Sequence, residues 1–252
     1  MATQPASSPF NNGLPMKREW GTALAALRRL LANGDDTEQV FRIMRALNGD
    51  VTQRNYRKLL TVPGGGKIAY KRVELAERLT DRAWIDSFEE GTVGAAYRDF
   101  LDSTGYSADG LAEISMVEFG AAEIEHPYTW MGRRERDIHD LWHVITGYKA
   151  DEHLGEACLV AFSYAQTGGL GWAFIGLGAA LKSLRVTRRT DFFKAVLEGY
   201  RHGKRAGWLH GEDYETLLAE PLDQARRRLN IAEPVKYRIA QASLAEQGLK
   251  GI

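Results

Sequence analysis

The sequence contains a single cysteine, Cys158, which excludes a disulfide within the chain and fits a reducing compartment. This cysteine lies in an apolar run, where the residue more commonly serves as a small core side chain than as a nucleophile. Charge of one sign is not in excess either, because Lys and Arg number 33 and Asp and Glu also number 33. This balance argues against nucleic-acid binding, which needs a basic surface.

Sustained alternation of apolar and polar residues, which is typical of half-buried strands, is also missing. Apolar residues recur instead at helical spacing, as at Trp20, Leu24, Leu27 and Leu31. We therefore predict an all-α fold, a single-domain helical bundle. The patterns predict helices over residues 17–32, 37–47, 51–61, 71–81, 92–103, 128–148, 189–202, 212–219 and 221–230.

Internal repeats are absent, and composition divides the chain into three parts. Residues 1–15 are small, polar and interrupted by Pro and Gly, which predicts a disordered N-terminal arm without a secretory signal. Residues 16–235 form the predicted helical domain, and residues 236–252 form a C-terminal tail or amphipathic helix.

The longest stretch without charge covers residues 157–181 and has the length of a membrane-spanning helix. Gly168 and Gly169, preceded by Gln166 and Thr167, interrupt it, and paired glycines are a turn signal. We predict a buried apolar helical hairpin whose two helices meet near these glycines.

A glycine-rich segment, GGGK at residues 64–67, resembles part of a phosphate-binding loop. The second glycine at the required spacing is missing, Ile68 stands in place of Ser or Thr, and no apolar strand precedes the segment. We predict a flexible connector here.

Metal-binding side chains gather most densely between His139 and Glu156. On a helix, His139 and His143 share one face, and Asp140 can turn toward the same site. Two imidazoles with carboxylates are ordinary ligands of zinc and other divalent ions, and we choose Glu156 as the fourth ligand. Paired histidines at this spacing also occur as capping, stacking or solvent-facing residues. Asp140 after the first histidine differs from the zinc-protease pattern, which has Glu there.

Adjacent His139 and Asp140 are also found in metal-dependent phosphohydrolases of the HD type. That chemistry needs a further histidine upstream and a distant aspartate. His126 and Asp191 are the residues available, although their sequence contexts do not support this role.

A carboxylate-bridged di-iron site in a bundle is a further alternative, since it needs two acid-x-x-His pairs. Glu123 with His126 and Asp140 with His143 have that spacing. Pro127 directly after His126 disfavours helical geometry at the first pair.

Four segments, taken together and in order, resemble a known family. The chain is similar to bacterial-type members of the family of the fourth Coq protein of ubiquinone (coenzyme Q) biosynthesis, whose hallmark is His-Asp-x-x-His followed by Glu. Twelve residues, 144–155, separate His143 from Glu156, one more than the eleven usual in the family. The similar segments are EEGTVGAAYRDFLDSTGYS (89–107), YTWMGRRERDIHDLWHVITG (128–147), LGEACLVAFSYAQTGG (154–169) and DYETLLAEPLDQARRRLNI (213–231).

The resemblance implies a metal- and lipid-binding domain with a divalent ion, zinc in the first place and magnesium, iron or manganese as alternatives. Its ligands would be His139, Asp140, His143 and Glu156. The implied reaction is C1 decarboxylation of a polyprenylated 4-hydroxybenzoate-type precursor, a carbon–carbon lyase activity, with or without hydroxylation at C1. The alternative is a non-catalytic lipid-binding scaffold that organises the biosynthetic complex.

For the enzyme, we assign catalytic roles to Arg136 and Asp140. Arg136 and Arg133 lie three and six residues before His139, and paired guanidinium donors suit a carboxylate. The same arginines, in a charged run with Asp137, are equally compatible with ordinary surface pairing.

The implied partners are the precursor, other ubiquinone-biosynthesis proteins, a membrane surface and a second copy of the chain in a homodimer. We expect a peripheral protein, cytoplasmic on the inner face of the membrane or, alternatively, on the matrix side of the mitochondrial inner membrane. Residues 17–32 and 236–252 are the candidate anchoring helices. The isoprenoid tail would enter a channel lined by Leu159, Phe162, Trp172, Phe174 and Leu177.

Overall fold

The computed structural model describes residues 17–107 and 126–249, and these residues confirm the all-α prediction. Apart from the helices, they contain one isolated antiparallel bridge between Thr92 and Pro221. The predicted N-terminal arm, residues 1–15, lies outside the described residues. The helices are α1 (Trp20–Ala32), α2 (Thr37–Leu47), α3 (Val51–Leu59), α4 (Gly65–Lys71), α5 (Leu75–Thr80), α6 (Arg82–Asp86), α7 (Val93–Thr104), α9 (Pro127–Asp137), α10 (His139–Thr146), α11 (His153–Thr167), α12 (Leu170–Thr187), α13 (Asp191–Arg205), α14 (Tyr214–Leu218), α15 (Leu222–Arg228) and α16 (Val235–Ala245).

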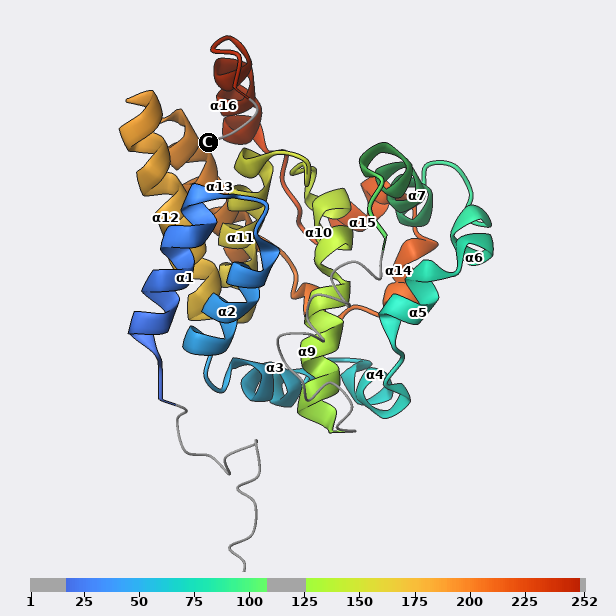
Figure 1. Ribbon diagram of the computed structural model, residues 1–252. Coiled ribbons are helices and arrows are strands. Elements are labelled where there is room, and N and C mark those ends of the chain that lie inside the picture. The colour runs from blue at the N-terminus through green and yellow to red at the C-terminus, as the bar shows by residue number, and fades with distance from the viewer. Residues whose placement is uncertain (1–16, 108–125, 250–252) are drawn as a thin grey trace, which may run out of the picture.

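Helices α9 and α10 follow one another through the middle of the molecule (Figure 1). On one side of them lie α1, α2, α11, α12 and α13, and on the other lie α5, α6, α7, α14 and α15. The largest buried apolar cluster includes residues from both sides, among them Tyr97 of α7, Trp142 of α10 and Phe162 of α11. The α10 helix is therefore placed where the two sides of the bundle meet.

The α11–α13 pair is the most closely packed part of the bundle. A Cβ atom at Gly199 would lie 2.3 Å from the carbonyl oxygen of Cys158, and one at Gly203 would lie 2.6 Å from that of Phe162. Glycine at both positions lets the two backbones meet directly. Cys158 is fully buried, as expected for a core residue, and burial raises the pKa of its thiol well above the usual value.

The predicted apolar hairpin is formed by α11 and α12, which are separated by Gly168 and Gly169. Gly168 has φ +74°, a left-handed conformation that favours glycine. Within the described residues, no helix has both the length and the apolar character to cross a bilayer.

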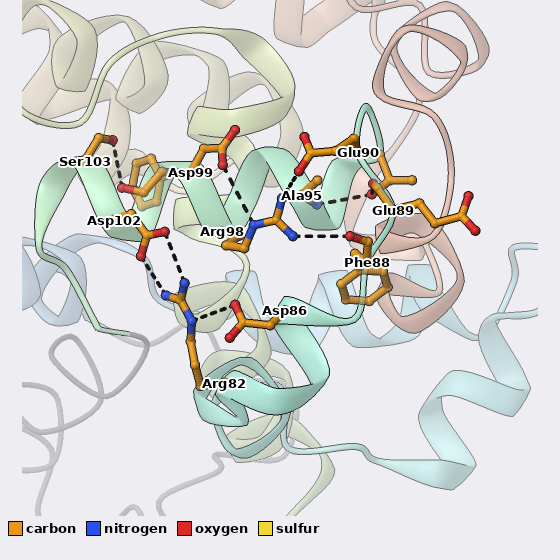
Figure 2. Close-up of polar contacts among 12 residues, drawn as sticks. Arg82, Asp86, Phe88, Glu89, Glu90, Ala95, Arg98, Asp99, Asp102 and Ser103 are labelled. Atoms are coloured by element: carbon orange, nitrogen blue, oxygen red, sulfur yellow. Dashed lines mark hydrogen bonds and ion pairs between the residues drawn. The ribbon is translucent and has the colours of Figure 1, made fainter.

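Helix α7 begins as its sequence predicts, because the Thr92 hydroxyl accepts the N–H of Ala95 at 3.2 Å. Arg82 of α6 holds α7 from outside through two contacts with Asp102, at 2.7 and 3.1 Å (Figure 2). A second arginine, Arg98, pairs with Glu90 at the start of the helix. These exposed ion pairs fix α7, which carries a ring that contacts the candidate site.

Two predictions near residue 70 are wrong. The GGGK segment is not a flexible connector, since Gly65–Lys71 forms α4. Gly65 is needed there because a Cβ atom would lie 1.8 Å from the carbonyl oxygen of Leu59. The helix predicted over 71–81 is shorter, because Arg72 has φ +46° and separates α4 from α5.

The helix predicted over residues 128–148 is divided into α9 and α10 at Ile138. Neither glycine nor proline stands at the break, so the sequence carries no signal for it. Beside it, the Asp137 carboxylate turns to α5 and accepts the N–H of Ala76 at 3.2 Å.

Candidate metal centre

Three ligand groups predicted from the sequence converge where α10 meets the first turn of α11. One ligand atom each from His139, His143 and Glu156 lies within 4.8 Å of the others. His143 Nε2 is 3.1 Å from Glu156 Oε1, and His139 Nε2 is 3.9 Å from Glu156 Oε2. Two imidazoles and a carboxylate suit zinc, but atoms bound to one zinc ion at about 2.0–2.1 Å are separated by little more than 3 Å, so the three groups would have to draw closer together around such an ion.

The orientation of the His143 ring also fits metal binding. Its Nδ1 is 2.8 Å from the carbonyl oxygen of Tyr148, which can only accept, so Nδ1 donates there and Nε2 is the nitrogen turned to the site, with a lone pair for a metal when the ring is neutral. Nε2 is buried and is not oriented for a hydrogen bond with any neighbour. A histidine held by a carbonyl at one nitrogen commonly binds a metal through the other.

Asp140 lies beside His139 rather than among the three converging groups. Its Oδ1 is 3.5 Å from His139 Nδ1, a contact at the outer limit of a hydrogen bond. Burial acts to lower the pKa of His139, but the contact with Asp140 and the charges of Glu156 and Asp140 outweigh burial, so the pKa is raised. The role of Asp140 as a ligand stays a prediction.

Glu156 is held by the turn that precedes it. Gly147, at φ +77°, ends α10, and the chain then folds back so that a Cβ atom at Gly155 would lie 2.0 Å from the carbonyl oxygen of Lys149. Burial acts to raise the pKa of Glu156, but the charges of the neighbouring histidines, His143 first, lower it.

A second carboxylate near the site, that of Glu152, has its hydrogen-bond partners on α16. Glu152 accepts hydrogen bonds from Tyr237 at 3.0 Å and from Gln241 at 2.7 Å, both on α16. Because these bonds direct Glu152 toward α16, the structure supports Glu156 as the convergent carboxylate.

Two aromatic rings from distant segments stack on the imidazoles. Phe100 of α7 lies on His143, with ring centroids 6.2 Å apart and an interplanar angle of 16°. Trp172 of α12 lies on His139, at 6.0 Å and 14°. Sequence reasoning missed both contacts, although it placed Phe100 on a buried helical face.

Tyr106, at the end of α7, is a further residue that the sequence did not indicate. Its ring packs edge-on against Phe100, with centroids 6.0 Å apart. Burial raises the pKa of its phenol, and the charges of Glu156 and Asp140 raise it further, which places the phenol within their field.

The predicted catalytic arginine has a carboxylate partner. Arg136 donates from Nε to Asp137 Oδ1 at 2.7 Å, and its second contact with that oxygen is 2.6 Å. Arg133 binds Glu74 at 2.9 and 2.6 Å. Both arginines are paired, as the alternative expected, but Arg136 and Asp137 are not at the surface, since their side chains are only 10% and 2% exposed. A substrate role for Arg136 stays a prediction.

Residues of the competing metal patterns do not join the group of three. His126 accepts the N–H of Tyr128 at 3.2 Å and caps α9. Asp191 starts α13 and pairs with Arg189 and Lys194. Glu123 lies outside the described residues. The described part of the chain gives these patterns no support.

The five residues expected to line a tail channel occupy different surroundings. Leu159 and Phe162 are fully buried in the main core, whereas Leu177 is 54% exposed. Trp172 and Phe174 pack against a second cluster formed with α1 and α2. A single channel lined by all five is therefore not present in this conformation of the described residues.

Comparison with known proteins agrees with the resemblance. Residues 16–235 match the family model of the coenzyme Q (ubiquinone) biosynthesis protein Coq4. The zebrafish (Danio rerio) ubiquinone biosynthesis protein COQ4 homolog, mitochondrial, is 31% identical over 175 residues, which cover 68% of this chain and 61% of the relative. The mitochondrial COQ4 of Yarrowia lipolytica is 24% identical over 208 residues, covering 79% and 76%.

The fold has a solved counterpart. The crystal structure of a Nostoc punctiforme protein described as a ubiquinone biosynthesis protein aligns with a TM-score of 0.60 at 21% identity, covering 86% of this chain and 100% of that one. At that identity the likeness concerns the fold alone. The family match, which extends over most of the sequence and includes the converging residues of α10 and α11, shows that this chain belongs to the Coq4 family of ubiquinone biosynthesis proteins.

Proposed function

We propose that the protein acts in ubiquinone biosynthesis as a metal-dependent carbon–carbon lyase on a polyprenylated 4-hydroxybenzoate-type precursor. The observation that carries the proposal is the convergence of His139, His143 and Glu156, in which the buried Nε2 of His143 lies 3.1 Å from the carboxylate. Family membership supplies the pathway.

His139, His143 and Glu156 would hold the ion, and zinc best suits two imidazoles and a carboxylate. When bound, the ion would supply Lewis-acid stabilisation of the oxygen on which negative charge develops. Asp140, beside His139 Nδ1, would orient that imidazole. Magnesium, iron and manganese are the alternatives, and elemental analysis of the purified protein distinguishes them.

In the proposed reaction the bond between C1 and its carboxyl carbon breaks, and carbon dioxide leaves. The electron pair stays at C1, which then takes a proton. Arg136 would bind the substrate carboxylate, for which it would exchange part of its contact with Asp137. Hydroxylation at C1 would also require a redox-active metal, dioxygen as the oxidant, and a reductant that supplies two electrons so that the second oxygen atom leaves as water.

A substrate with a polyprenyl tail lies in the membrane, so the protein needs a surface that binds lipid. The exposed side of α1 and α12 carries suitable side chains. The helices run side by side, since Trp20 contacts Phe174 and Lys182 donates to the carbonyl of Leu31. Neither helix contains Asp or Glu. Their exposed residues include apolar and basic side chains, namely Trp20, Leu24, Leu177, Leu181, Arg28, Arg29 and Arg185.

This surface favours α1 over residues 236–252 as the anchoring segment. Apolar area and basic charge together attract a protein to anionic lipid. We place the protein peripherally on the cytoplasmic inner face of the membrane or, alternatively, on the matrix side of the mitochondrial inner membrane. The names of the curated relatives describe those proteins as mitochondrial.

Metal content and turnover test the proposal. We would measure metal by elemental analysis in wild type, His143→Ala and His202→Ala, purified without chelator or nickel resin. His202 is a matched control. It lies on α13, its ring contacts the Tyr148 hydroxyl, and it is not part of the group of three. We expect near-stoichiometric metal in wild type and His202→Ala and its loss in His143→Ala. A folded wild type without metal would overturn the metal site.

Carbon dioxide release from a prenylated 4-hydroxybenzoate would then identify the lyase.

A second candidate is a lipid-binding scaffold that organises the biosynthetic complex, alone or as a homodimer. The observation that favours it is the pairing of Arg136 with Asp137, which occupies the expected carboxylate-binding group. Metal-loaded protein that retains the precursor without consuming it would support the scaffold.

A further inference from the structure

The two histidines of the candidate metal centre are held in different ways. His143 has a 2.8 Å hydrogen bond from Nδ1 to the Tyr148 carbonyl, which sets the rotation of its ring. For His139, Nδ1 has a 3.5 Å contact with Asp140, Nε2 is 3.9 Å from Glu156, and the ring meets that of His143 edge-on. None of these polar contacts has the length of an ordinary hydrogen bond, so a packed neighbour can help to set the plane of the His139 imidazole.

The indole of Trp172 is the group in position to do so. It lies nearly parallel to the His139 ring, at an interplanar angle of 14° and a centroid separation of 6.0 Å. Its Nε1 donates to Glu135 Oε1 at 3.2 Å. Glu135 stands one helical turn before His139, so the helix that leads to the histidine also anchors the ring stacked on it.

Glu135 is itself confined. Its side chain is only 12% exposed, and its second oxygen, Oε2, lies 3.6 Å from Nε2 of the fully buried His210. Neither ring nitrogen of His210 has a hydrogen-bond partner among the described residues. The Glu135 carboxylate is the acidic group that lies beside the ring. Glu135 is therefore placed between His210 and the indole.

The backbone that carries Trp172 is also fixed. The N–H of Gly171 donates to Asn48 Oδ1 at 2.9 Å, which attaches the start of α12 to the end of α2. A Cβ atom at Gly171 would lie 2.4 Å from the sulfur of Met44. With its backbone held by α2 and its Nε1 held by α9, the indole has little freedom to leave the imidazole.

We propose that Trp172 and Glu135 are positioning residues that hold the imidazole of His139 in its metal-binding orientation. The inference rests on the proposed metal function, because it concerns how one ligand of that site is prepared. It assigns Trp172 to the metal centre, in place of the tail channel that the sequence suggested. It also links the site to α2 and His210 through the described contacts.

The test uses cobalt(II) as a spectroscopic probe in wild type, Trp172→Leu, Trp172→Phe, Glu135→Ala and Glu135→Gln. We expect Trp172→Leu and Glu135→Ala to weaken metal binding about tenfold and to shift the visible d–d absorption. Glu135→Gln keeps an acceptor for Nε1 and should restore most of the wild-type spectrum, whereas Trp172→Phe keeps a stacking ring without the bond to Glu135 and should lie between wild type and Trp172→Leu. Trp84→Leu is the control, since Trp84 packs on Arg78 and Phe88 instead.

A second arm keeps failure of the inference distinct from failure of the metal site. Side-chain NMR of metal-free protein reports whether the His139 ring has one orientation. We expect one set of ring resonances in wild type and broadened or shifted ones in Trp172→Leu and Glu135→Ala. If wild type binds no cobalt but this difference is seen, the positioning role holds and the metal function fails. Unchanged cobalt and NMR spectra in folded Trp172→Leu would overturn the inference.

Discussion

Gly155 and Lys149 are in direct backbone contact, since a Cβ atom at position 155 would lie 2.0 Å from the Lys149 carbonyl oxygen. The carbonyl belongs to the turn after α10, and Gly155 immediately precedes Glu156. The contact therefore fixes the carboxylate relative to the two histidines of α10.

Gly155→Ala should separate the turn from α11 and displace Glu156. We expect zinc affinity to fall at least about tenfold and stability to fall by about 1–3 kcal/mol, the usual cost of overpacking. Competition with a chromophoric chelator and thermal unfolding measure the two effects. Gly176→Ala is the control, because a Cβ atom there would meet its nearest neighbour at 3.6 Å. Equal zinc affinity in Gly155→Ala and Gly176→Ala would contradict the role of this contact.

Gly199→Ala should destabilise the bundle without acting on the metal centre. The added Cβ atom would lie 2.3 Å from the Cys158 carbonyl oxygen, so α13 would have to move away from α11. We expect a loss of about 2–3 kcal/mol in the free energy of unfolding, measured with urea. Gly21→Ala, in a helix and with no heavy atom within 4 Å of its Cβ, should instead stabilise by up to about 1 kcal/mol. A neutral Gly199→Ala would show that the helices can separate at little cost.

Zinc affinity should decrease as pH falls from 8 to 6. The pKa of His139 is raised, chiefly because Asp140 and Glu156 outweigh the effect of burial, and a protonated imidazole cannot bind metal. Below that pKa we expect about a tenfold loss per pH unit for the one proton displaced. Isothermal titration calorimetry with zinc, in buffers that bind the metal weakly, measures the zinc affinity at each pH.

In the metal-free protein, the stability that His139 contributes should change with pH in the opposite direction to the zinc affinity. A raised His139 pKa contributes stability that is fully present below about 6.5, the unfolded value, and is lost as pH rises through the folded value. Thermal unfolding of metal-free wild type and His139→Gln at pH 6 and pH 8 separates this contribution from others. A wild-type advantage that grows with pH would contradict the assignment.

Removing exposed apolar residues from α1 and α12 should weaken membrane binding. We expect Leu24→Ser with Leu177→Ser to lower affinity about tenfold for vesicles containing phosphatidylserine, because both residues are exposed, at 43% and 54%. Arg28→Gln with Arg29→Gln should act on anionic vesicles and much less on phosphatidylcholine alone. Leu60→Ser is the control, since Leu60 is equally exposed but lies at the end of α3. Unchanged flotation of both double variants would exclude this face.

The sequence predicted what depends on local spacing. The i, i+4 relation placed His139 and His143 on one face, and the helix predicted over residues 92–103 is present as α7, capped by Thr92. Contacts between distant segments were not predictable. The Trp172 ring meets His139 from a helix whose start is attached to Asn48 through Gly171, and nothing near residue 172 indicates that.

The errors have the same origin. The break at Ile138 carries no glycine or proline, and Asp137 finds its partner at Ala76, far away in the chain. Conversely, the glycines at 64–66 suggested a connector, whereas Gly65 is there to let α4 approach Leu59. Local composition could not distinguish a flexible glycine from one required by close packing.

The turn between α10 and α11 makes the metal ligands near neighbours along the chain, and this limits what an ion there can do for folding. Cross-linking a short segment removes less conformational entropy from the unfolded chain than cross-linking distant segments does, although the difference grows slowly with length. The bundle is joined elsewhere, where Gly199 and Gly203 bring α13 against α11. Loss of the ion would thus loosen the turn while the helical core stays assembled, so occupancy and folding can vary separately.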